Sequence, residues 1–338
     1  MLNEQEIIEL MSRELPSGPG RISGRGTHDA EVCTFEGDRL LFSTDEFSAE
    51  DRFPAADPFA LGWNIAAGAI SDIVATGGTP HYFAHALTVD ERWNAAFCMH
   101  YCRGVRNVLE HYGTTFIGGD IGRAAAWRCT ASVIGTPSGR IIGRQGANAG
   151  DHLFVTGSIG GGNFNAAIDL HSDRLPDPAA RFGTVRFRLH AAGIPLVAKW
   201  ARACIDTSDG LFNALITLAD MNRTGFRIDR IPLLKRGIVA AKLLQLPEEL
   251  LFLGECGEYE LLIVVHDGHT AGLLAEADKL KYPLKYIGRL TDTHEGRFLP
   301  FGKRPVDVSG LSIRARDYSD TSTYLGAIQQ WIATVKNG

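Results

Sequence analysis

Four aspartates in the first 120 residues stand in short motifs, among small or polar residues. They are Asp29 in THDA, Asp45 in STD, Asp72 in ISD and Asp120 in GGD. Magnesium prefers hard oxygen ligands and commonly takes one or two carboxylates together with phosphate oxygens and water. Each aspartate alone would serve equally well in a turn or on a solvated face. As a set, they predict a site for a Mg²⁺–nucleotide complex.

A further acidic motif, Asp206-Thr207-Ser208-Asp209-Gly210, stands directly before the apolar segment LFNALITLADM. Asp206 or Ser208 would serve as a plain helix N-cap, which stabilises a helix by about 1 kcal/mol. Two aspartates three residues apart, followed by a glycine, would also suit metal binding and the orientation of an attacking group. The motif alone leaves both interpretations open.

Glycines near the acidic motifs would let a phosphate chain approach the backbone closely. The chain has 38 glycines in 338 residues, and Gly77, Gly118 and Gly119 stand close to the acidic motifs. The loop at residues 157–163 joins a strand to a helix, but it lacks the Lys-Ser/Thr pair of a Walker motif and does not fit G-x-G-x-x-G. We interpret it first as a tight turn and only second as a nucleotide contact.

The elements that must position these residues follow from the hydrophobic pattern. AEVCTF and RLLFSTD predict a hairpin, residues 58–76 and 91–112 predict helices, and HYFAHALTV, TTFIGGD and WRCTASVIGTP predict strands. The turn-rich segment RIIGRQGANAGD indicates a boundary between a domain at residues 1–148 and another at residues 149–338. LFVTG, YELLIVV and YPLKYIGRL then alternate with helical segments, so we expect a two-domain α+β or layered α/β fold.

Composition excludes several classes of protein. The chain is 45% hydrophobic and 22% charged, which is typical of a globular protein. Its net charge of -5 and the absence of a long basic run argue against a nucleic-acid partner. No signal-peptide pattern or uninterrupted apolar run of about 18 residues occurs, so we expect a cytoplasmic protein without a membrane partner. Six scattered cysteines without a C-x-x-C pair are expected to stay reduced.

The ordered series of motifs resembles one known family over residues 22–290. THDA, STD, DPFALGWNIAAGAISDIVATGGTP, IGGD, GRQGANAGDHLFVTG, IDTSDGL and GECGEYELLIVV are similar to the motifs of thiamine-monophosphate kinase. That family belongs to the superfamily of aminoimidazole-ribonucleotide synthetase. The resemblance implies a homodimer whose N-terminal sheets pair into a barrel. It also implies a cleft between the domains that binds ATP, several Mg²⁺ ions and a small-molecule acceptor.

The resemblance also implies roles for individual residues. The implied metal ligands are Asp29, Ser43, Asp45, Asp72, Asp120, Asp206 and Asp209. The implied nucleotide contacts are Thr44, Gly118, Gly119, Asp120, Arg144 and Ser208. Asp206 and Asp209 would be the catalytic pair. Phosphoryl transfer depends mostly on positioning and on charge neutralisation, and an acid-rich site with one or two arginines suits both.

The sequence departs from the kinase pattern where the acceptor should bind. Thr27-His28-Asp29 replaces Gly-Asp-Asp, and Arg52 replaces the histidine that the kinase uses for its substrate. An arginine would suit a phosphate or carboxylate through its planar fork of donors. The segment at residues 256–261 replaces Gly-Gly-Glu-Asp-Tyr-Glu-Leu and leaves Glu258 as the acceptor-facing acid. No C-terminal aromatic matches the one that stacks on thiamine, because Trp331 lies in a helix-like tail.

Three functions are compatible with these features. The leading hypothesis is ATP-dependent phosphoryl transfer to a small molecule, with thiamine monophosphate as the first candidate. The second keeps the fold but activates an amide or carbonyl oxygen by phosphorylation, as in a ligase, cyclase or dehydratase. The third is a non-catalytic protein that binds a nucleotide or a partner, motivated by the altered THD and CGEYE motifs.

Overall fold

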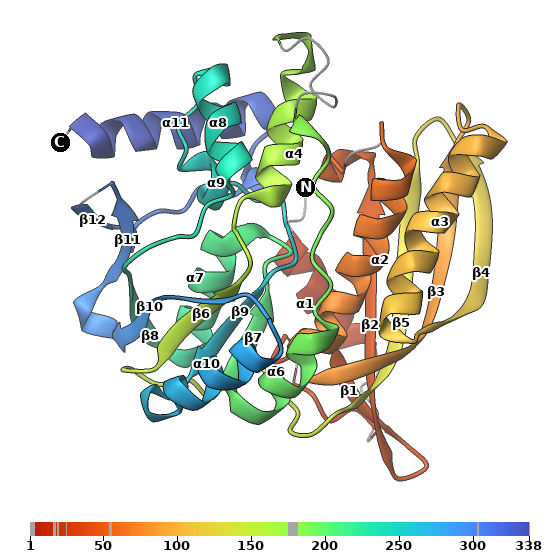
Figure 1. Ribbon diagram of the computed structural model, residues 1–338, viewed down its shortest axis with the longest axis horizontal. Coiled ribbons are helices and arrows are strands. Elements are labelled where there is room, and N and C mark those ends of the chain that lie inside the picture. Colours follow the sequence, from red (N-terminus) through yellow and green to blue (C-terminus); the bar gives the residue numbers. More distant parts are fainter. Residues whose placement is uncertain are drawn as a thin grey trace.

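The structure is a computed structural model that describes residues 4–15, 18, 20–24, 26–53, 56–174, 182–302 and 304–337. Two sheets, each with its own helices, lie side by side (Figure 1). Helix α1 (Glu4–Glu14) precedes them. The predicted two-domain fold that mixes helices and strands is therefore confirmed.

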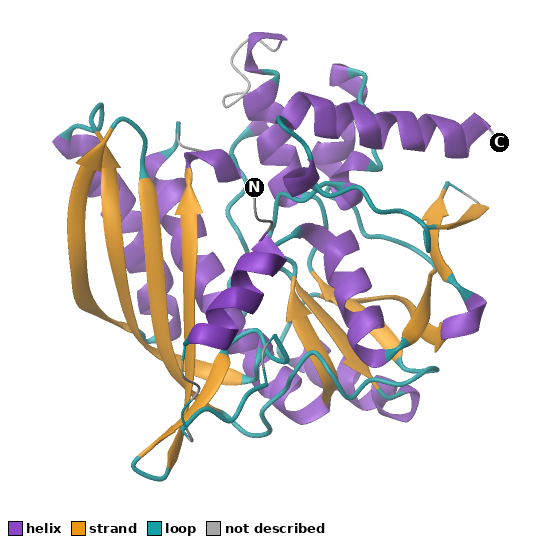
Figure 2. Ribbon diagram, turned by 180° about the vertical axis from the view of Figure 1, so that it is seen from behind, coloured by secondary structure: helices purple, strands orange, loops and turns teal. Residues whose placement is uncertain are grey.

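The first sheet has five strands in the order β1-β2-β5-β3-β4. Its strands are β1 (Glu31–Phe35), β2 (Asp38–Ser48), β3 (Gly78–Asp90), β4 (Thr115–Ala124) and β5 (Arg128–Pro137). All neighbours are antiparallel except β3 and β4. Helices α2 (Pro58–Ala75) and α3 (Ala95–Tyr112) cover one face, while no helix of the described residues covers the other face (Figure 2).

Two glycines allow helices α2 and α3 to pack closely. A Cβ atom on Gly62 would lie 2.1 Å from the carbonyl oxygen of Tyr101, and one on Gly104 would lie 2.1 Å from that of Phe59. Helix α3 begins at Ala95, later than the predicted start at residue 91, because the side chain of Asn94 caps it by accepting from the Phe97 N–H.

Helix α2 is long and apolar enough to cross a bilayer by length and hydropathy, but 78% of it is buried inside the protein. It packs between the first sheet, helix α3 and the second domain. Its apolar character therefore reflects its place in the core.

The second sheet has seven strands in the order β12-β11-β8-β10-β6-β9-β7. Its strands are β6 (His152–Thr156), β7 (Ala201–Asp206), β8 (Thr224–Ile228), β9 (Leu261–Val265), β10 (Leu284–Asp292), β11 (Arg297–Phe301) and β12 (Arg304–Asp307). Its helices are α4 (Gly161–Leu170), α6 (Ile194–Trp200), α7 (Gly210–Asn222), α8 (Lys235–Leu244), α9 (Leu250–Leu253), α10 (Thr270–Lys279) and α11 (Thr321–Asn337). Helix α9 contacts α4, α7 and α11. Helices α4, α8, α9 and α11 gather at one end of the sheet, whereas α7 packs against the strands (Figure 1).

Candidate active site

Three carboxylates from distant parts of the chain meet between the two domains. Oxygen atoms of Asp29, Asp72 and Asp206 all lie within 4.8 Å of one another. Asp29 precedes β1, Asp72 lies on α2 and Asp206 ends β7. The structure therefore brings together two of the predicted first-domain aspartates with one from the second domain.

Hydrogen bonds hold these carboxylates in place. The Ser43 hydroxyl donates to Asp72 at 2.5 Å, and the Ser71 hydroxyl donates to Asp206. The backbone N–H of Asp206 donates to Asp29 at 3.1 Å. Asp45 lies beside Asp72, because alternation along β2 places Asp45 and Ser43 on the same face of the sheet.

Burial dominates the electrostatics of this cluster. It raises the pKa of Asp29 to about 7, although the guanidinium of Arg144 opposes the shift by donating from Nε to Asp29 at 2.6 Å. Burial and then the neighbouring acids Asp206 and Asp29 raise the pKa of Asp45 to about 7. Burial also raises the pKa of Asp72 and Asp206. Carboxylates held this close favour a divalent cation, because it would offset both the lost solvation and the mutual repulsion.

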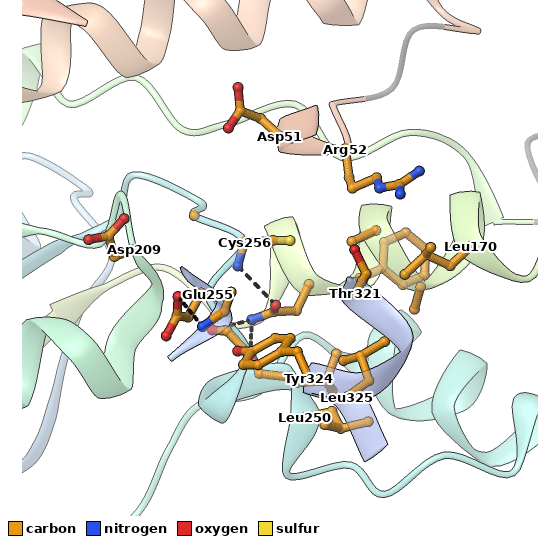
Figure 3. A pocket seen from close by; sticks show the side chains of 18 of the residues that line it. Asp51, Arg52, Leu170, Asp209, Leu250, Glu255, Cys256, Thr321, Tyr324 and Leu325 are labelled. Atoms are coloured by element: carbon orange, nitrogen blue, oxygen red, sulfur yellow. Dashed lines mark hydrogen bonds between the residues drawn. The ribbon is translucent and has the colours of Figure 1, made fainter. Parts of the chain in front are cut away.

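A cleft of about 710 Å³ opens from this cluster. Its acidic end is lined by Asp45, Asp72, Asp206, Ser208 and Asp209, and Glu50 and Asp51 lie nearby. Its other end is largely apolar and is lined by α4, α8, α9, the first half of α11 and the segment that leads into it. Figure 3 shows Asp51 and Arg52 across the pocket from Leu250 and Tyr324.

Arg52 is held in an unusual conformation at the edge of the cleft. Its φ of 55° lies in the left-handed region, which non-glycine residues rarely adopt. Its guanidinium donates to Asp169 on α4 at 3.1 Å, and its side chain is about one-third exposed. Tyr259, which also lines the cleft, has a φ of 56°. Two such residues on one cleft are consistent with a site whose geometry is fixed by its surroundings.

Several predicted nucleotide contacts do not reach the cluster within one chain. The hydroxyl of Thr44 pairs with that of Ser132 at 3.0 Å on the helix-free face of the sheet, opposite to Asp45. Gly118, Gly119 and Asp120 lie on β4, which is separated from β2 by β5 and β3. Three strand spacings of about 4.8 Å place β4 roughly 14 Å from β2. Arg144 and Ser208, by contrast, lie at the cluster and at the acidic end.

Glu258 differs from its predicted role as an acid facing the acceptor. Its side chain is buried, and one carboxylate oxygen accepts from the Gly160 N–H at 2.8 Å, at the N-terminus of α4. Burial raises its pKa to about 8, while the N–H groups of Gly160, Gly162 and Gly161 oppose the shift. The carboxylate thus occupies the place that a phosphate would take at the loop of residues 157–163. This loop is therefore a turn whose backbone N–H groups are bound by the carboxylate of Glu258.

Sequence reasoning missed the residues that form the apolar end. Tyr318, Tyr324 and Leu325 line the cleft from the C-terminal segment, and Leu250 does so from α9. Tyr324 is 5% exposed, and its hydroxyl has no hydrogen-bond partner among the described residues. No local motif marks these positions, because their approach to the cleft depends on how α11 docks against α9.

Comparison with known proteins defines the class. Residues 27–143 match the N-terminal domain, and residues 148–299 the C-terminal domain, of the AIR synthase related proteins. The chain therefore belongs to the AIR synthase related family.

Its relatives within this family include the thiamine-monophosphate kinase of Escherichia coli K12, with 30% identity over 270 residues that cover 76% of this chain and 80% of the relative. The Aquifex aeolicus thiamine-monophosphate kinase is 28% identical over 232 residues, which cover 68% of this chain and 73% of the relative.

Solved structures share the fold. The tt0281 protein of Thermus thermophilus has a TM-score of 0.73 at 25% identity and covers 90% of this chain and 98% of its own. AaThiL complexed with AMPPCP and TMP has a TM-score of 0.71 at 22% identity, with coverage of 90% and 96%. The hydrogenase maturation protein HypE of E. coli has a TM-score of 0.66 at 20% identity, with coverage of 92% and 99%.

Proposed function

We propose that this protein is an ATP- and Mg²⁺-dependent kinase whose acceptor is thiamine monophosphate or a closely related small phosphate ester. The carboxylate cluster of Asp29, Asp72 and Asp206 carries this proposal, since it opens into a cleft large enough for an organic substrate. The kinase relatives and the fold shared with AaThiL support the same reaction.

The cluster fits the metal that such a reaction needs. Asp29, Asp72 and Asp206 would hold Mg²⁺, with Asp45 beside them, through the hard oxygen ligands that this ion prefers. Mg²⁺ bound there would neutralise negative charge on the phosphate oxygens.

The chain's own residues orient the two substrates. Arg144 is anchored by Asp29 at the cluster, where its remaining donors would contact the nucleotide phosphates. Arg52 would exchange its pairing with Asp169 for the phosphate of the acceptor. An oxygen of that phosphate would attack the γ-phosphorus of ATP, so that the bond to the β-phosphate oxygen breaks and ADP leaves. Ser208 and Asp209 are exposed at the acidic end and would help to align the transferred group.

The predicted homodimer would account for the residues that lie away from the cluster. Strand β4 is an exposed edge strand, and Phe116, Ile117 and Ile121 on it are 50%, 57% and 66% exposed. Pairing of a second copy against this strand and the helix-free face would cover these side chains and close the barrel. Thr44, Gly118, Gly119 and Asp120 would then face the nucleotide across the interface. We place the dimer in the cytoplasm, with residues 1–148 as its dimerisation domain and residues 149–338 completing the cleft.

Phosphorus-31 NMR tests the reaction. Wild-type protein with ATP, Mg²⁺ and thiamine monophosphate should give thiamine diphosphate and ADP in equal amounts. Asp209→Asn should lose this activity, whereas Asp278→Asn, on an exposed position of α10, should keep it. Release of inorganic phosphate without a diphosphate product, or no turnover of ATP by the wild type, would contradict the proposal.

A further inference from the structure

The C-terminal segment forms a wall of the cleft, although it lies beyond the part of the chain that matches the family domains, which ends at residue 299. The residues of this segment that line the cleft include Ala315, Tyr318, Asp320, Thr321, Tyr324 and Leu325. Phosphoryl transfer at the acidic end requires side-chain contacts that fix the position of this segment relative to that end.

Arg314 makes that connection on one side. Its Nη1 donates to the Asn213 side-chain oxygen at 2.6 Å, and the Asn213 side-chain nitrogen donates to the backbone carbonyl of Asp209 at 2.9 Å. Asn213 is buried in the first turn of α7. Arg314 is thus linked through one side chain to the backbone of a residue at the acidic end.

Arg314 also reaches a buried acid on the other side. Its Nε lies 3.4 Å from Oε1 of Glu255, which lines the cleft. This oxygen is buried and has no hydrogen-bond partner among the described residues. The other oxygen of Glu255 accepts from the Ala315 N–H at 3.1 Å. A buried carboxylate needs a compensating charge, and Arg314 is the cation placed to supply it.

We propose that Arg314 is a positioning residue for phosphoryl transfer. It holds the turn that carries Ser208 and Asp209, through Asn213, in a fixed relation to Glu255 and to the C-terminal wall. The acceptor end and the transfer end of the cleft are therefore set as one unit. This inference rests on the proposed kinase function, but its first consequence is structural.

A second ion pair of the same segment provides a matched control. Lys336, near the end of α11, donates to Glu249 before α9, with Nζ 2.6 Å from one carboxylate oxygen and 2.8 Å from the other. Glu249 is buried, as a good anchor for α11 should be. Neither residue lines the cleft or bonds to α7 among the described residues. A variant that lacks this ion pair therefore shows how much the anchoring of α11 alone contributes to kcat.

The test compares Arg314→Lys with Lys336→Gln. Lysine keeps the positive charge near Glu255 but cannot reproduce the fork that serves Glu255 and Asn213 together. We expect Arg314→Lys to lower kcat about 10-fold or more, because small misplacements of reacting groups are costly. The KM for ATP should change little, and Lys336→Gln should keep the wild-type kcat. In an Asn213→Ala background, Arg314→Lys should cause no further loss.

Hydrogen–deuterium exchange without Mg²⁺ or nucleotide gives a readout independent of activity. Exchange at residues 207–213 should be faster in Arg314→Lys and unchanged in Lys336→Gln. Equal exchange in Arg314→Lys and wild type, or equal losses of kcat in the two variants, would overturn the inference. A wild type without kinase activity would instead refute the proposed function, and the exchange experiment would still decide the role of Arg314.

Discussion

The two ends of the cleft are built in different ways. The acidic end takes its carboxylates from several elements: Asp29 precedes β1, Asp45 lies within β2, Asp72 lies on α2 and Asp206 ends β7. Serine hydroxyls and backbone N–H groups fix their positions. The apolar end is made by helices α4, α8, α9 and α11 and by the segment that leads into α11. The residues of these elements that line the cleft are mostly aliphatic or aromatic. The carboxylates of the acidic end repel one another, whereas the apolar end provides a surface that a substrate of matching shape can contact. We infer that the reaction depends on the first end and the choice of acceptor on the second.

Asp72→Asn, at the acidic end of the cleft, should have the largest effect. Loss of one carboxylate ligand should lower kcat/KM about 1000-fold, a loss comparable to removal of a key electrostatic group elsewhere. The melting temperature without Mg²⁺ should rise by a few degrees, because burial and repulsion destabilise the ionised form of Asp72. Steady-state kinetics and thermal unfolding measure both. If Asp72→Asn stayed active, or if the exposed control Asp278→Asn lost as much activity, the acidic end would not be the reaction centre.

Arg52→Ala, at the edge of the cleft between its two ends, should weaken binding of the acceptor. Loss of its charge-assisted contacts should raise the KM for the acceptor about 10- to 100-fold and leave the KM for ATP nearly unchanged. Arg106→Ala, which removes an exposed ion pair with Glu110 on α3, is the matched control and should change neither constant. A larger effect of Arg52→Ala on ATP than on the acceptor would assign this arginine to the nucleotide.

The effect of Mg²⁺ on stability should grow with pH. Asp29 and Asp45 have a pKa raised from 3.8 to about 7, so their contribution to folding is fully present below pH 4 and is lost as pH rises through 7. Mg²⁺ binds the ionised carboxylates and should restore this loss. The increase in melting temperature on addition of Mg²⁺ should therefore be greater at pH 8 than at pH 6. An equal increase at both values would mean that these groups do not bind the ion.

Tyr324→Phe, at the apolar end of the cleft, should have the smallest effect. The Tyr324 hydroxyl is buried without a hydrogen-bond partner among the described residues, so its removal should leave the free energy of unfolding within about 0.5 kcal/mol of wild type. The KM for the acceptor should also stay close to the wild-type value. Denaturant unfolding tests this, and a loss well above that figure would show that the hydroxyl has a partner in solution.

The sequence predicts the acidic end because its carboxylates lie in local motifs. Asp29, Asp72 and Asp206 are identified by the residues beside them, and the structure brings them together. Thr44 lies on the opposite face of β2 from Ser43 and Asp45, because side chains alternate along a strand, so its predicted nucleotide contact requires a second copy of the chain. The alternation of side chains along a strand is enough to predict on which face of the sheet Thr44 lies.

The remaining residues depend on tertiary structure. Glu258 binds the N-terminus of a helix nearly 100 residues earlier in the chain, a pairing that no local pattern reveals. The cleft-lining positions of Tyr318 and Tyr324 depend on the docking of α11 against α9. Helix periodicity predicts that such a helix is amphipathic but not which surface it covers.

Crystallography with Mn²⁺ in place of Mg²⁺ and a non-hydrolysable ATP analogue can show whether the carboxylate cluster is the metal site, because Mn²⁺ gives an anomalous signal. We predict a peak between the domains, about 2.1 Å from oxygens of at least two of Asp29, Asp72 and Asp206. Manganese bound elsewhere, or a nucleotide bound away from these carboxylates in a protein that still phosphorylates thiamine monophosphate, would contradict it.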